Sequence, residues 1–94
     1  MTANLEQLRV DFAADGNSSA ITWRGGEGHM LVEGSFGGGT LKLKWLYRDV
    51  TYIEVGTNTN MTAAGASIFT LPEGVTLRLE LTGSAGPAIK ATLL

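Results

Sequence analysis

The sequence predicts an all-β fold, an antiparallel β-sandwich of about eight strands. Three observations carry this prediction: apolar and polar residues alternate along most of the chain, glycines separate the alternating runs, and no long segment has helical periodicity. Strict alternation is typical of a strand with one buried face, because successive side chains of a strand point to opposite sides. Strands with one polar face favour antiparallel sheets, and two such sheets stack on their apolar faces.

The clearest period lies at 40–56. Leu41 and Leu43 alternate with lysines, and the pattern continues through Trp45 and Tyr47 to a turn at 48–51 and a second alternating run. This arrangement predicts a β-hairpin. The same period places Trp45 and Tyr47 on the face of the leucines, so both aromatic side chains are expected in the core.

The chain before this hairpin divides into short elements. They are a strand at 8–12, a turn at 15–18, a strand at 19–23, a loop at 24–29, a strand at 30–36 and a glycine turn at 37–39. Gly34 lies inside a strand, which often marks a bulge or the close approach of another backbone. The glycine turn is short, so the two strands beside it are expected to be neighbours.

The chain after the hairpin continues in the same way. A polar connection at 57–65 that crosses between sheets precedes a strand at 66–71, a turn at 72–74, a strand at 75–81, a turn at 83–87 and a strand at 89–93. We expect one domain over residues 1–94, with 1–7 as an N-terminal arm. The regular spacing of the strands fits a jelly-roll or immunoglobulin-like sandwich, and a small closed barrel is the alternative.

Composition narrows the function. The net charge is −2 and Lys/Arg residues are not clustered, so a nucleic-acid partner is not expected. The chain has no cysteine, no apolar run near the roughly 20 residues that span a bilayer, and no apparent signal peptide. Its single histidine, His29, makes neither a metal site nor a catalytic triad, and the glycine-rich stretches lack the helix that a phosphate loop needs. We expect no enzyme activity, metal or cofactor.

Four residues are candidate contacts with a partner. Leu31 and Leu46 are apolar residues on otherwise polar strand faces, and Tyr52 shares a face with Glu54 and is the best candidate for an exposed aromatic. Leu5 belongs to the polar N-terminal segment, which has no obvious place in a sandwich. An aromatic platform that includes Tyr52 would fit a carbohydrate-binding module.

The chain also resembles a family of small all-β proteins from tailed-bacteriophage virions. The similarity lies in ITWRGGEGHMLVEGSFGGGTLKLKW, YIEVGTNTNMTAAGASIFTLPEGVTLRLELTG and IKATLL. It implies a structural protein on the capsid surface, a decoration or cement protein that binds the major capsid protein. Self-association is expected, with a trimer as the first expectation because capsids have three-fold axes. A tail- or fibre-associated adhesion module that binds carbohydrate is the alternative.

Overall fold

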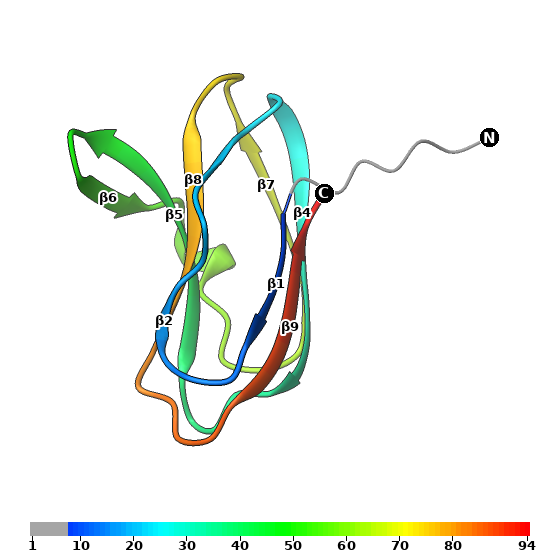
Figure 1. Cartoon of the computed structure of the whole chain (residues 1–94). Helices are drawn as coiled ribbons and strands as arrows, with labels where there is room; N and C mark the ends of the chain where they lie inside the picture. Colours follow the sequence, from blue (N-terminus) through cyan, green and yellow to red (C-terminus); the bar gives the residue numbers. More distant parts are fainter. Residues whose placement is uncertain (1–7) are drawn as a thin grey trace.

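The computed structural model describes residues 8–94, which form two antiparallel sheets packed face to face (Figure 1). The elements, in chain order, are β1 (Leu8–Phe12), β2 (Gly16–Asn17), β3 (Ile21–Thr22), β4 (Gly26–Ser35), β5 (Thr40–Arg48), β6 (Thr51–Glu54), the 3-10 helix η1 (Thr57–Thr59), β7 (Gly65–Leu71), β8 (Thr76–Thr82) and β9 (Ala88–Leu93). The prediction of an all-β sandwich is confirmed. The expected arm at 1–7 lies outside the described residues.

The strand order identifies the type of sandwich. One sheet runs β1-β9-β4-β7, and the other runs β2-β8-β5-β6, with β3 pairing along the same strand β8. If β2 and β3 are taken as one interrupted strand, the first four strands pair with the last four in reverse order: β1 with β9, β2/β3 with β8, β4 with β7, and β5 with β6. This is the jelly-roll arrangement. The two sheets share no strand, so the fold is a sandwich and not a closed barrel.

The inner faces of both sheets supply the core. Leu41 and Leu43 of β5, Leu77 and Leu79 of β8, and Ile89 of β9 are all at most 1% exposed, as their alternation predicts. Burial of a side chain of this size stabilises a fold by roughly 1.5–3 kcal/mol. The core is therefore built by the strands whose alternation is clearest.

Trp23 closes one end of the core. It is fully buried, its ring centroid lies 5.0 Å from that of Phe69, and the guanidinium of Arg24 lies 4.4 Å from its ring centroid. Gly28 lies against the same ring, where an added Cβ would be 2.5 Å from two Trp23 ring atoms. The predicted loop at 24–29 is therefore too long: Arg24 and Gly25 are irregular, but β4 already begins at Gly26, and Gly28 is a strand residue that makes room for the indole.

Two short turns also differ from the prediction. The glycine turn at 37–39 joins β4 to β5, which lie in different sheets, so the strands beside it are not neighbours. Positive φ angles at Gly37 and Gly38 let the chain cross between the layers there. The predicted turn at 15–18 contains the two-residue strand β2, which pairs with β8.

Two other expectations about connections are confirmed. The segment 57–65 crosses from β6 in one sheet to β7 in the other. Gly34 has a φ of 108° and lies directly against the Ala88 carbonyl of the neighbouring strand β9, so the expected close approach of another backbone is present.

Candidate functional site

The candidate contact residues from the sequence lie on opposite sides of the sandwich. Leu31 is 39% exposed on the outer face of the β1-β9-β4-β7 sheet. Leu46 and Tyr52 lie directly opposite each other on the outer face of the other sheet. Leu5 lies outside the described residues. These outer faces point in opposite directions in Figure 1, so the three described candidates do not form one surface.

The outer face around Leu46 and Tyr52 carries a network of ion pairs. Lys42 Nζ lies 3.1 Å from Glu54 Oε1, and Lys44 Nζ lies 2.9 Å from Glu80 Oε1. The Lys42 ammonium, followed by the Asn60 amide, donates hydrogen bonds to Glu54 and lowers the pKa of its carboxyl below the usual 4.5. Ion pairs of this partly exposed kind contribute little to stability, but they leave these charges already partnered.

Tyr52 belongs to the same network. The Arg78 guanidinium carbon lies 3.7 Å from the centroid of the Tyr52 ring, and Arg78 Nη2 lies 3.7 Å from Glu80 Oε2. Tyr52 is consequently half-buried beneath an arginine, and Leu46 is half-buried beside it. On this face Tyr52 therefore packs within a network of charged side chains and does not form an open aromatic platform.

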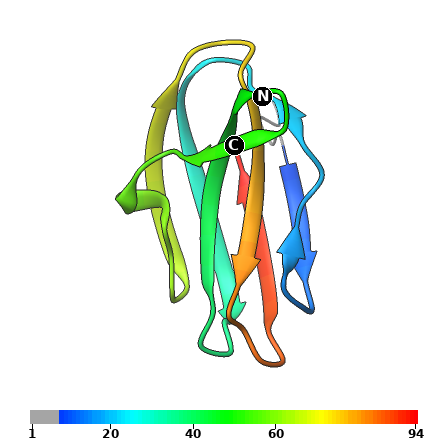
Figure 2. The same cartoon turned by 90° about the vertical axis from the view of Figure 1, so that its left-hand side faces the viewer.

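The tip of the β5–β6 hairpin presents a different surface. β5 pairs with β8 only as far as Trp45, which lies opposite Leu77, whereas its pairing with β6 continues to Arg48. Beyond Trp45 the hairpin is therefore a two-stranded ribbon that leaves the sandwich. Figure 1 shows it projecting to the left of the body, and Figure 2 shows it crossing in front of the sheet.

The projecting ribbon exposes apolar side chains. Tyr47 is 64% exposed and Val50 at the turn is 87% exposed. Ile53, which lies opposite Trp45 at the base of the ribbon, is 38% exposed. The expectation that Tyr47 lies in the core is wrong, because no second sheet faces this part of the strand. Trp45, at the base of the ribbon, is half-buried and packs against the core. We call Tyr47, Val50 and Ile53 the hairpin patch.

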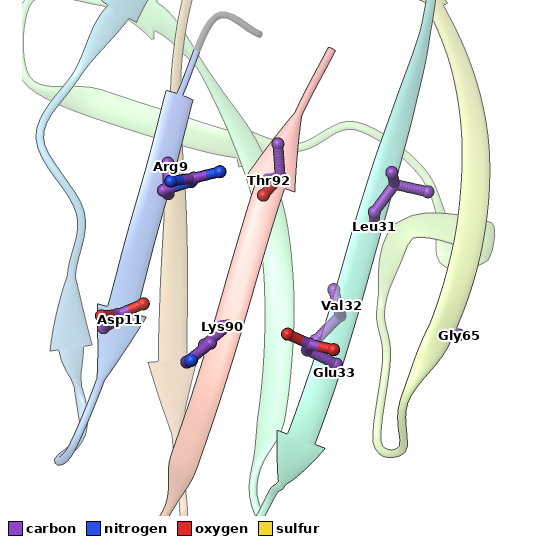
Figure 3. A pocket seen from close by; sticks show the side chains of 8 residues that line it. All are labelled: Arg9, Asp11, Leu31, Val32, Glu33, Gly65, Lys90 and Thr92. Atoms are coloured by element: carbon purple, nitrogen blue, oxygen red, sulfur yellow. The ribbon is translucent and has the colours of Figure 1, made fainter.

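A hollow of about 530 Å³ lies on the outer face of the other sheet (Figure 3). One row across its strands is Arg9 on β1, Thr92 on β9 and Leu31 on β4, in direct register. The short Thr92 side chain lies between two longer ones, so it forms a floor between two walls.

A second row of the hollow is charged. Lys90 of β9 lies directly opposite Asp11 of β1 on one side and Glu33 of β4 on the other. In Figure 3 the end of the Lys90 side chain is directed toward the Asp11 side of the hollow. Opposite charges at directly facing strand positions stabilise a sheet modestly and hold the side chains over it.

One further carboxylate is held by hydrogen bonds. The Gly83 and Ser84 amides donate to Asp15 at 3.1 and 3.0 Å, and the Ser84 hydroxyl donates to it as well. The hydroxyl is the largest cause that lowers the pKa of Asp15 below its usual 3.8. This contact joins the turn after β1 to the turn after β8, which gives Asp15 a structural role.

The chain's single histidine lies near one carboxylate. His29 Nε2 lies 3.6 Å from Glu27 Oε1, and the two side chains are 41% and 64% exposed. Within residues 8–94, no three His, Cys, Asp or Glu residues gather in a way that could hold a metal ion. No helix within those residues is both long enough and apolar enough to cross a membrane.

Comparison with known proteins adds no relative: neither the models of protein families, nor the curated proteins, nor the solved structures contain a match to this chain.

Sequence reasoning missed both the hairpin patch and most of the hollow. One signal was present for the patch, because the alternating stretch 40–48 is longer than the run 75–81 that pairs with it. No comparable signal marked the hollow. Its lining residues are far apart in the sequence, and only strand pairing brings Arg9, Thr92 and Leu31 into one row.

Proposed function

We propose that this chain is a non-enzymatic structural protein of a virion, and that it docks on the capsid shell through the hairpin patch. The observation that carries the proposal is the exposure of Tyr47 and Val50 on a ribbon that extends beyond the sandwich, together with that of Ile53 at the base of the ribbon. An isolated two-stranded ribbon is marginally stable in water. A partner that covers the apolar face of the ribbon would stabilise the ribbon, and the buried apolar contact would favour binding.

The chemistry of the hairpin patch fits a protein partner. Tyrosine is enriched among the residues that dominate binding energy at protein interfaces. Burial of apolar surface contributes roughly 25 cal/mol per Å² before the costs of association are subtracted. The expected receptor is an apolar groove on the major capsid protein. A chain that binds the assembled shell but not its separate subunits stabilises the shell by mass action.

Two further arguments support the virion assignment. The sequence resembles small virion proteins of tailed bacteriophages over most of its length, and jelly rolls occur in viral capsid domains. The same fold also builds lectin domains, so the argument from fold is one of analogy. A tail- or fibre-associated carbohydrate-binding module is the second candidate. The proposed location is the capsid surface, and the proposed oligomeric state is a trimer.

Composition of the particle tests the assignment. Mass spectrometry of purified virions should detect the chain in a fixed, high ratio to the major capsid protein. A few copies per particle would favour the tail or a fibre, and absence from the particle would contradict the virion assignment.

Cosedimentation with purified capsid shells tests the docking surface. Val50→Ser and Tyr47→Ser should lose binding to the shells while the thermal unfolding midpoint stays near that of the wild type. Ile68→Ser is the matched control, because Ile68 is 53% exposed but lies on β7, outside the hairpin patch. If the hairpin variants sediment with shells as well as the control does, the patch is not the docking surface.

A further inference from the structure

The hollow on the outer face of the β1-β9-β4-β7 sheet is balanced in charge. Two cationic side chains, Arg9 and Lys90, and two carboxylates, Asp11 and Glu33, line it. Its formal charge is therefore zero, with donors and acceptors distributed over three strands. A site of this kind offers no net attraction to an anion or a cation, and its polar lining is unsuited to a purely apolar ligand.

The size and shape of the hollow fit a small ligand. Its volume of about 530 Å³ lies within the range of roughly 300–1,000 Å³ that is typical of small-molecule sites. A second copy of the same concave face would leave both hollows unfilled, so face-to-face self-association is a poor match.

The lining also has the chemistry that sugar hydroxyl groups require. A hydroxyl both donates and accepts hydrogen bonds, carboxylates only accept, and guanidinium and ammonium groups only donate. Asp11 and Glu33 can accept from sugar hydroxyls, Arg9 and Lys90 can donate to them, and Thr92 can do either. Bonds of this kind with a charged partner are stronger than those between neutral groups.

Leu31 supplies the apolar contact that a sugar ring also needs. It is 39% exposed at the wall opposite Arg9 and offers an apolar surface to the C–H face of a pyranose ring. We infer that the hollow is a binding site for one or two residues of a neutral glycan, held between Arg9 and Leu31 above Thr92. This site is separate from the hairpin patch, and the inference does not depend on the virion assignment.

Titration of the full-length ¹⁵N-labelled protein with neutral oligosaccharides tests the site. The probes are maltohexaose, cellohexaose and chitohexaose, with hexagalacturonate as an acidic comparison. At least one neutral probe should produce saturable shifts centred on the amides of β9 and the facing part of β4. Lys90→Met and Thr92→Val should each weaken that binding about tenfold, the equivalent of about 1.4 kcal/mol.

Control substitutions outside the hollow show whether the binding is specific to it. Thr70→Val makes the same substitution on the outer face of β7, outside the hollow, and should bind like the wild type. Tyr52→Ala on the opposite sheet should also bind normally. The inference is overturned if no neutral probe binds, if hexagalacturonate binds more tightly, or if Tyr52→Ala abolishes binding while Thr92→Val does not. The variants of the hollow, Lys90→Met and Thr92→Val, lie on β9 and leave the hairpin unchanged, so docking on shells is tested separately.

Discussion

The two halves of β5 have the same alternating pattern and opposite environments. In the lower half, Leu41 and Leu43 are fully buried between the sheets. In the upper half, Tyr47 continues the same sequence period, yet it is 64% exposed and lies at a register shift between Leu46 and Arg48 in the pairing with β6. The difference arises because β8 ends its pairing at Trp45 and the opposing sheet does not extend over the ribbon. Alternation therefore identifies the face of a strand, while burial depends on a second layer over that face.

The largest expected effect is a difference in stability between substitutions in the two halves of β5. Leu43→Ala should lower the free energy of unfolding by about 2–5 kcal/mol, because it removes buried methyl groups and leaves a cavity. Tyr47→Ala should change it by less than about 0.5 kcal/mol, since little contact is lost at an exposed position. Urea unfolding of both variants measures the contrast. Equal losses would mean that the ribbon is packed in solution.

A steric change tests how closely the sandwich half is packed. Gly28→Ala should destabilise the fold by about 1–3 kcal/mol, because its Cβ would overlap the Trp23 ring at 2.5 Å. The atoms concerned belong to the six-membered ring of the indole. Trp23→Phe removes part of that ring, so the double variant should cost less than the sum of the single variants. Additive costs in thermal or urea unfolding would contradict this packing.

Two arginine–tyrosine pairs provide a smaller contrast, one between the hairpin and β8 and one within the hairpin. Arg78 lies 3.7 Å from the Tyr52 ring centroid, whereas Arg48 lies 5.8 Å from the exposed Tyr47 ring. A double-mutant cycle with Tyr52→Leu and Arg78→Met should give a coupling of about 0.5–1 kcal/mol. The same cycle at Tyr47 and Arg48 should give a coupling near zero. A larger coupling at Tyr47 would reverse the order that the distances imply.

The smallest effect concerns two carboxylates with lowered pKa values. Asp15 owes its shift to the Ser84 hydroxyl and backbone amides, and Glu54 chiefly to the Lys42 ammonium. Because each folded pKa lies below its unfolded value, each ionised group stabilises the fold above that value, and this stabilisation is lost as pH falls through the folded pKa.

The pKa values of Glu54 and Asp15 should respond differently to salt. At 1 M NaCl the Debye length is about 3 Å, so the pKa of Glu54 should rise toward 4.5 while that of Asp15 moves less. An NMR pH titration at low and high salt measures both. A larger salt-dependent rise at Asp15 would show that charge, rather than hydrogen bonding to amides and a hydroxyl, lowers its pKa.

Local pattern alone was sufficient for much of the fold. The alternation of Leu77 and Leu79 with polar residues identified β8 and its buried face, and Gly34 correctly indicated a close backbone approach. These inferences succeed because period and backbone sterics are properties of a few neighbouring residues. The same reasoning failed at Gly28, since a glycine that makes room for Trp23 cannot be distinguished locally from a loop glycine.

The candidate sites depend on the tertiary structure. The sequence by itself determined which residues are apolar, which alternate and which chemistry is absent, such as that of cysteine. It did not determine that the turn at 37–39 crosses between sheets, or that Arg9 and Thr92 form one row. It also did not determine that Tyr47 lies beyond the part of β5 that pairs with β8. Those facts follow from which strands pair and where each pairing ends. Pairing is set by packing among residues far apart in the chain, and no local pattern records it.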